Sequence, residues 1–318
     1  MRAVDRAPLR SRRQLRLPIA SMPDGSTLSI PVNVLTGSSR RPRLLAVAGH
    51  HGDEQEGPSS LVALWRDLKP EALRGTVVMV PVLNPPAFQA VRRTNHEDQL
   101  DINRIFPGRP DGTVTERLAY ALCGDLVPDA DLVLSMHGWS SGYVVHPYVE
   151  YPKSGQASKR SRLAAEAFGL DTVNPLDAGP GRLLTEAAAH GTPIIEVEIG
   201  GQATSVPARR ALYEAGVRNL LTHTGITSTP RPNPTKPQAV DRIEISAPTG
   251  GILRTELDTG QRVMRGQTIA SIFDLNLNRT ATVRSPVAGF VGVLRLAASV
   301  LPGQLVATVF TPLGRAHD

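Results

Sequence analysis

Short apolar runs alternate along the chain with longer segments in which apolar residues recur every three or four positions. Short runs bounded by Gly or Pro are typical of buried strands, whereas the longer spacing indicates one apolar face of a helix. The predicted strands cover residues 27–34, 44–48, 76–83, 131–138 and 193–201. The predicted helices cover residues 58–68, 113–126, 158–168, 182–190 and 206–223. Because strands and helices alternate, we expect an α/β fold with a mixed, mainly parallel sheet flanked by helices.

The pattern changes beyond a proline-rich stretch. Residues 228–237 contain four prolines, which is typical of a linker. After it come short Val, Ile and Leu runs separated by glycine turns, a spacing that predicts a small all-β sandwich or barrel. The predicted organisation is an N-terminal arm (1–24), a large α/β domain (25–226), a linker (227–239) and a smaller all-β C-terminal domain (240–318).

The first residues are strongly basic. Six of the first sixteen are arginine, within a formal net charge of +6 for the chain. We interpret residues 1–24 as a solvated basic arm, and we place the strand at 27–34 at the edge of the sheet because Pro31 cannot donate to a β-ladder. The arm lacks the interleaved aromatic residues on which single-stranded nucleic acids stack, so its charge does not indicate nucleic-acid binding.

The composition, with 41% hydrophobic and 20% charged residues in 318, is that of a globular protein. No run approaches the roughly 18 apolar residues that cross a membrane, and the N-terminus lacks the apolar core of a secretory signal. The single cysteine, Cys123, excludes an intramolecular disulfide, which fits a reducing compartment. We therefore expect a cytoplasmic protein without a membrane or nucleic-acid partner.

One segment has no periodicity. Residues 84–111 are dense in Pro, Arg, Asn and Asp, and they lie inside the predicted α/β domain. A loop of this length in a compact domain is usually functional or disordered. Its second half ends in a close alternation of apolar and polar residues, which favours a binding loop.

Two predicted strands lead into histidines. His51 follows the strand at 44–48, and His137 lies at the end of the strand at 131–138. The carboxyl ends of neighbouring parallel strands meet at one edge of a sheet, where ligands usually bind. Glu54 lies three residues after His51, so the three side chains could form the two-imidazole, one-carboxylate set of a catalytic zinc site, which leaves one position for water. A lone H-x-x-E motif is often a surface coincidence, but the second histidine argues against that here.

Glu196 and Glu198 interrupt the apolar run of the last predicted strand of the α/β domain. Alternate residues of a strand share a face, so the two carboxylates point the same way. A buried carboxylate would result unless that face lines an active site.

Four motifs occur in the order found in the succinylglutamate desuccinylase/aspartoacylase family, which the chain resembles over about residues 25–226. They are Gly49-His-His-Gly-Asp-Glu54, Leu100-Asp-Ile-Asn-Arg-Ile-Phe-Pro-Gly108, Met136-His-Gly138 and Val197-Glu-Ile-Gly-Gly201. The resemblance implies a fold similar to that of the zinc carboxypeptidases. Residues 240–312 resemble the lipoyl-like barrel-sandwich hybrid domain of many members. They lack an Asp-Lys or Met-Lys hairpin to accept lipoate, so we expect a structural or gating role.

The resemblance also implies a metal site and a general base. His51, Glu54 and His137 correspond to the ligands of one zinc ion per chain, which makes residues 25–226 a zinc-dependent catalytic domain. Glu198 corresponds to the general base, which takes a proton from water and passes it to the leaving nitrogen. Glu196 is its competitor for that role.

Further roles follow from the same resemblance. Asn103 and Arg104 match the pair that holds a substrate carboxylate, a task that suits the two parallel donors of a guanidinium. An ion pair with Asp101 is the alternative for Arg104. Arg182 is expected to reach the pocket.

One arginine corresponds to the group that stabilises the oxyanion. Arg93 matches it best, with the neighbouring Arg92 as the alternative. Asp53 is expected to support a ligating histidine, because such histidines usually donate their second N–H to an oxygen.

These residues predict a zinc-dependent amidohydrolase acting on an N-acyl amino acid or a similar small carboxylated amide. Among two-domain members, the chain is most similar to the deacetylases of N-acetyl-diaminobutyrate in ectoine breakdown. One alternative is a metallocarboxypeptidase that removes a C-terminal residue from a peptide. Another is a non-catalytic metal-containing binding protein. A homo-oligomer is compatible with each.

Overall fold

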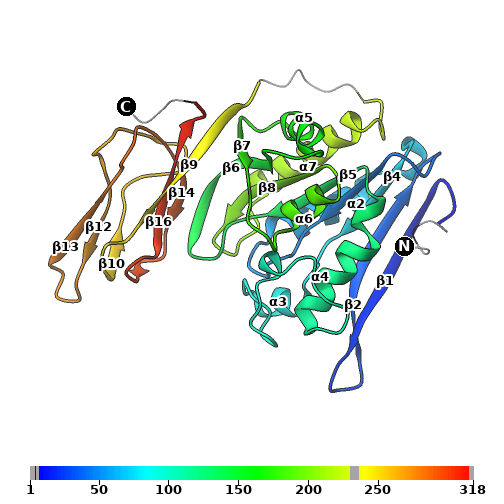
Figure 1. The fold of residues 1–318 in the computed structure, drawn as a ribbon, viewed down its shortest axis with the longest axis horizontal. Helices are drawn as coiled ribbons and strands as arrows, with labels where there is room; N and C mark the ends of the chain where they lie inside the picture. The colour runs from blue at the N-terminus through cyan, green and yellow to red at the C-terminus, as the bar shows by residue number, and fades with distance from the viewer. Residues whose placement is uncertain (1–3, 5–6, 230–235, 315–318) are drawn as a thin grey trace.

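The computed structural model describes residue 4, residues 7–229 and residues 236–314, and a large sheet with helices on both faces dominates it (Figure 1). In the α/β part the strand order is β1 (Ser11–Ser21), β2 (Thr27–Thr36), β4 (Thr76–Val80), β3 (Arg43–Val47), β5 (Leu132–His137), β8 (Ile194–Gly201), β6 (Tyr143–Pro152) and β7 (Thr172–Leu176). Pairing is parallel from β4 through β3 and β5 to β8, and again from β6 to β7. The other pairs are antiparallel. The predicted mixed, mainly parallel α/β sheet is confirmed.

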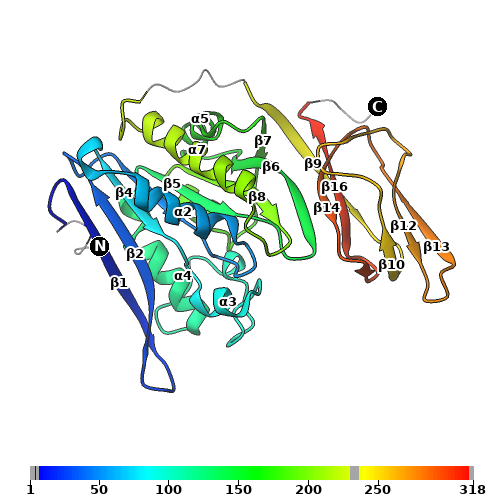
Figure 2. The same cartoon turned by 180° about the vertical axis from the view of Figure 1, so that it is seen from behind.

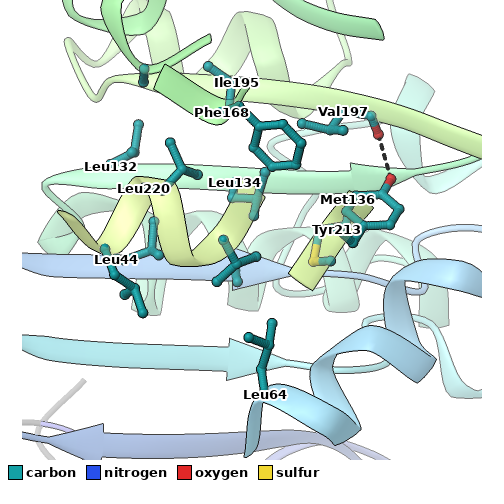
Figure 3. Close-up of a cluster of buried hydrophobic side chains, with 14 of the residues drawn as sticks. Leu44, Leu64, Leu132, Leu134, Met136, Phe168, Ile195, Val197, Tyr213 and Leu220 are labelled. Carbon is teal, nitrogen blue, oxygen red and sulfur yellow. Dashed lines mark hydrogen bonds between the residues drawn. The ribbon is translucent and has the colours of Figure 1, made fainter. Parts of the chain in front are cut away.

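Helices cover both faces of this sheet, as Figures 1 and 2 show from opposite sides. They are α2 (Glu56–Asp67), α3 (Pro85–Ala90), α4 (Val114–Asp125), α5 (Ser158–Phe168), α6 (Leu183–Ala189) and α7 (Pro207–His223), with 3₁₀ turns η1 (Pro70–Ala72), η2 (Ile102–Arg104) and η3 (Val127–Asp129). One buried cluster joins α2, α5 and α7 to the sheet, and Figure 3 shows part of it around Leu134 and Phe168. A second cluster joins α4 and α6 to the opposite face. Within the described ranges, no helix is long and apolar enough to cross a membrane.

The N-terminal segment is a strand rather than a solvated arm. β1 pairs antiparallel with β2 from Ser11↔Thr36 to Ser21↔Thr27. Arg16 is exposed, whereas Leu15 and Leu17 on either side of it are partly buried and pack against the second core cluster. One face of the strand therefore contacts the core, so the predicted arm at 1–24 is wrong for residues 11–21. β1 also takes the edge of the sheet, which makes β2 an inner strand instead of the predicted edge strand.

The C-terminal region is all-β, as predicted. A four-stranded sheet contains β13 (Arg279–Arg284), β12 (Thr268–Phe273), β10 (Gly251–Arg254) and β15 (Ser299–Val300). The opposing strands are β9 (Gln238–Ser246), β16 (Leu305–Pro312), β14 (Gly289–Arg295) and β11 (Arg262–Val263). Apolar residues from both groups form a third buried cluster. β9 begins within the predicted linker at 227–239, and residues 230–235 of that linker lie outside the described residues.

The two parts of the chain share one sheet. β7 pairs with β9, β9 with β16, β16 with β14, and β14 returns to β6, which itself pairs with β7. These five strands therefore close a ring. Its interior is filled by Val145, Tyr148, Val240, Val293 and Phe310, all of them buried. The C-terminal region is thus joined to the α/β part by β-ladders on two sides, in addition to the covalent connection.

Candidate active site

A cavity of about 790 Å³ opens at the carboxyl ends of β5 and β8. The residues predicted as metal ligands, catalytic groups or substrate-binding groups line it: His51, Glu54, Arg93, Asn103, Arg104, His137, Arg182 and Glu198. Residues from the C-terminal region complete the wall: Asp241, Arg242, Ile243, Glu244 and Leu305. The C-terminal region is therefore a component of the pocket.

The turn after β3 and the end of β5 bring three ligand-type side chains together. Nδ1 of His51 lies 2.7 Å from one oxygen of Glu54, and Nδ1 of His137 lies 3.0 Å from the other. All three side chains are buried, and their ligand atoms lie within 4.8 Å of one another. Gly52 permits this turn, because a Cβ there would lie only 1.8 Å from the carbonyl oxygen of Ala87.

The far nitrogen of each histidine is held by an oxygen. Nε2 of His51 lies 2.9 Å from Asp101, and Nε2 of His137 lies 3.0 Å from the Ser135 hydroxyl. These contacts orient both rings so that Nδ1 faces the shared centre, which is the arrangement of metal-ligating histidines. Two imidazole nitrogens and a carboxylate oxygen in a buried site fit a zinc ion. Asp53 accepts a hydrogen bond from the backbone of Ser141 instead, so its predicted support of a histidine is wrong.

Asp101 also anchors an arginine beside the metal site. Nε and Nη2 of Arg93 each lie 3.0 Å from the Asp101 carboxylate, and Nη1 lies 3.6 Å from Glu54. Although burial opposes ionisation, the hydrogen bond and charge of His51, together with Arg93, hold the pKa of Asp101 below its usual value. Arg93 lines the cavity, whereas Arg92 does not. Of the two candidates, the structure places Arg93 at the site.

Asn103 and Arg104 lie in η2, which Asp101 caps through the backbone N–H of Asn103. Asn103 is buried, and its side-chain oxygen accepts a hydrogen bond from the backbone of Leu183 at 3.0 Å. The Arg104 side chain instead extends into the cavity wall, with Nη1 bonded to the carbonyl of Asn103 at 2.7 Å. Arg104 makes no ion pair with any described residue, so its remaining donors are free for a ligand. The alternative ion pair with Asp101 is absent from the described structure.

Glu196 and Glu198 share one face of β8 but differ in their surroundings. Glu196 is ion-paired with Arg182 and lies 3.6 Å from Nε2 of His137. Burial opposes its ionisation, yet Arg182 and His137 lower the pKa of Glu196 to about 2. Glu198 pairs in register with His137, and one of its oxygens is buried without a hydrogen-bond partner among the described residues. Burial, then the charges of Glu54 and Glu150, raise the pKa of Glu198 well above its usual value.

A buried carboxylate that the sequence did not indicate connects the wall of the cavity. Glu150 of β6 accepts hydrogen bonds from Arg182 at 2.7 Å and from Arg242 of β9. The Arg242 guanidinium also lies over the rings of Trp139 and Tyr148, 5.6 and 5.5 Å from their centroids. Arg182 lines the pocket as predicted, but its Nη2 already serves two carboxylates.

Comparisons with known proteins find a matching family and similar solved structures. The family described as succinylglutamate desuccinylase/aspartoacylase catalytic domain matches residues 40–224. An N-alpha-acetyl-L-2,4-diaminobutyric acid deacetylase from Halomonas elongata is 32% identical over 307 residues, covering 93% of this chain and 90% of that protein. The product-bound structure of the ectoine utilization protein EutE (DoeB) from Ruegeria pomeroyi matches with a TM-score of 0.87 at 28% identity, covering 96% of this chain and 97% of that one. A succinylglutamate desuccinylase/aspartoacylase from Rhodobacter sphaeroides gives 0.86 at 27% identity, covering 95% and 96%.

Proposed function

This chain belongs to the succinylglutamate desuccinylase/aspartoacylase family, and on that premise we propose that it is a zinc-dependent deacylase that hydrolyses the amide bond of an N-acyl amino acid. One observation carries the proposal. Three buried ligand-type side chains converge at the same end of the sheet as Glu198, a carboxyl group with a buried, partnerless oxygen. Hydrolysis of an amide by metal-activated water requires metal ligands and, next to them, a carboxylate that is free to accept a proton.

We assign each residue one role in the reaction. A zinc ion held by His51, Glu54 and His137 would supply a Lewis acid that polarises the amide carbonyl and lowers the pKa of water. Glu198 accepts the proton of the attacking water and delivers it to the leaving nitrogen. The opposite pKa shifts of the two β8 carboxylates favour Glu198 over Glu196, since a group held ionised by Arg182 is a poor proton acceptor.

The substrate is held by two arginines that line the cavity. Arg93 donates to the carbonyl oxygen as negative charge develops on it. Arg104, which forms no ion pair with a described residue, binds the carboxylate of the amino acid. Asn103 lies next to it in η2 and accepts a hydrogen bond from the backbone of Leu183, the first residue of α6. The deacetylase from Halomonas elongata supplies the first compound to test, N-alpha-acetyl-L-2,4-diaminobutyrate.

The decisive experiment compares N-acyl amino acids with short peptides, using protein stripped of metal and then reloaded with zinc. We expect hydrolysis of acyl amino acids only after reloading. Glu198→Gln should retain one zinc per chain and lose at least about a hundredfold in kcat, because an amide cannot accept the proton. Cleavage of peptides alone would instead establish the carboxypeptidase alternative, and bound zinc without any amide hydrolysis would establish a binding protein.

A further inference from the structure

Tyr213 belongs to the buried cluster on the face of the sheet that α2, α5 and α7 cover. It is fully buried on α7 and packs edge-on against Phe168, with ring centroids 6.4 Å apart. Its hydroxyl leaves this apolar cluster in the direction of the sheet. There it lies 2.8 Å from the carbonyl oxygen of Val197 and within hydrogen-bonding distance of the carbonyl oxygen of His137 (Figure 3 shows the bond to Val197).

The two carbonyls belong to the two strands that carry the reaction. His137 is the last residue of β5 and a proposed metal ligand, while Val197 is joined by its peptide bond to Glu198, the proposed base. In the register of these parallel strands, Met136 is opposite Val197 and His137 is opposite Glu198. One hydroxyl therefore contacts the backbone of a ligand residue and the backbone that leads into the base.

This contact lies where the ladder between the strands ends. The pairing of β5 with β8 stops at His137↔Glu198, and β8 continues through Gly200 and Gly201, which have φ values of +112° and +123°. A hydroxyl has one proton, so the two carbonyls share it in a three-centred bond. In apolar surroundings such a bond is strong, and its loss removes a link between the ends of the two strands.

We propose that Tyr213 is a positioning residue that sets the separation of His137 and Glu198, and with it the placement of the metal site relative to the base. The inference rests on the proposed function for the identity of these two residues. Tyr213 touches neither substrate nor metal. It acts by holding the ends of two strands together from the side of the sheet opposite the cavity.

Tyr213→Phe tests the proposal because it removes only the hydroxyl. Altering a residue that orients metal ligands typically costs about 10- to 100-fold in metal affinity or activity. We expect kcat to fall by at least about tenfold with KM within about twofold, and zinc affinity, measured by chelator competition, to fall in parallel. Tyr151→Phe is the matched control. Tyr151 is 7% exposed in the same buried cluster, and its hydroxyl makes no hydrogen bond to the described residues. It should change neither quantity.

Several results would overturn the proposal. Wild-type kcat and zinc affinity in Tyr213→Phe, measured well below its unfolding temperature, would leave the hydroxyl a purely structural role. Phe168→Leu loosens the same packing but keeps the hydroxyl, so an equal loss of kcat there would assign the effect to the core. If Tyr213→Phe does not fold, a crystal structure of the zinc-loaded wild type decides, and a hydroxyl away from either carbonyl refutes the proposal. If the wild type hydrolyses no amide, the proposed function fails, while zinc affinity still tests Tyr213.

Discussion

Glu150→Gln is the substitution whose effect the structure defines most closely. Glu150 is fully buried and accepts hydrogen bonds from Arg182 and Arg242. With Glu196 these residues form a group of two carboxylates and two guanidiniums. Glutamine keeps the shape of the side chain but removes the charge, and it turns an NH₂ group toward one of the arginines. The four side chains then carry a net positive charge, which the exposed Glu244, 3.8 Å from Arg242, offsets in part.

The size of the expected stability loss depends on how deeply the ion pairs are buried. Removing one partner of a buried ion pair costs about 3–5 kcal/mol. Here Arg182 keeps Glu196, and the side chains of Arg182 and Arg242 are 19% and 17% exposed. We therefore expect Glu150→Gln to lower the free energy of unfolding by about 2–3 kcal/mol, which is less than the full cost of breaking a buried pair. With an unfolding entropy of about 2.1 cal/mol/K per residue, this corresponds to about 4 °C in Tm for a chain of this length.

Urea denaturation followed by tryptophan fluorescence measures this loss. Arg242→Met, alone and combined with Glu150→Gln, completes a double-mutant cycle in which we expect a coupling of about 1–3 kcal/mol. Glu166→Gln is the control, since Glu166 forms an exposed pair with Arg162 on α5 that is worth only about 0.3–0.5 kcal/mol. A cost for Glu150→Gln no larger than that of the control, or strictly additive single effects, would refute the reasoning.

Three shorter predictions concern single side chains. Asp101→Ala removes the carboxylate whose two oxygens orient His51 and Arg93, so zinc affinity in a chelator titration should fall about 10- to 100-fold, and unchanged affinity would contradict this role. Arg104→Ala should raise KM for an N-acyl amino acid about 10- to 100-fold with little change in kcat, because a charge-assisted hydrogen bond is worth about 1.5–3 kcal/mol; an effect on kcat alone would place Arg104 elsewhere in the reaction. Burial, then Glu186, raises the pKa of Cys123 to about 12, against about 8.5 for a free thiol. The folded protein should therefore resist alkylation at pH 8 and react readily in urea, and rapid labelling of the native protein would contradict the raised pKa of this half-buried thiol.

The elements with strong local periodicity could be predicted from the sequence. The helix expected at 158–168 is α5 itself, and the strands expected at 44–48 and 131–138 correspond to β3 and β5. The elements that were missed depend on distant partners. β6 carries Glu150 and Pro152, and β7 carries Asn174 and Pro175, so neither resembles a buried strand locally. Both become strands because neighbouring strands of the sheet, including some from the C-terminal region, satisfy their backbone groups.

The same distinction applies to the site. His51, Glu54 and His137 could be recognised because they lie at the ends of predicted strands or within a few residues of them. Those positions place all three side chains at the same edge of the sheet. Asp101 had a weaker local signal, since it lies two residues before Asn103 at the start of η2. Arg242 had no such signal, because only the pairing of β9 with β7 and β16 brings it to the cavity.

The closed ring of β6, β7, β9, β16 and β14 holds part of the cavity rim in place. A ring that is hydrogen-bonded at every seam has no free edge from which it can unzip, so its strands cannot swing aside as a flap. Much of the cavity rim, including Asn174, Arg242 and Leu305, belongs to these strands. This part of the rim is therefore joined to the α/β sheet by continuous β-ladders, so the C-terminal region and the cavity wall form one hydrogen-bonded unit.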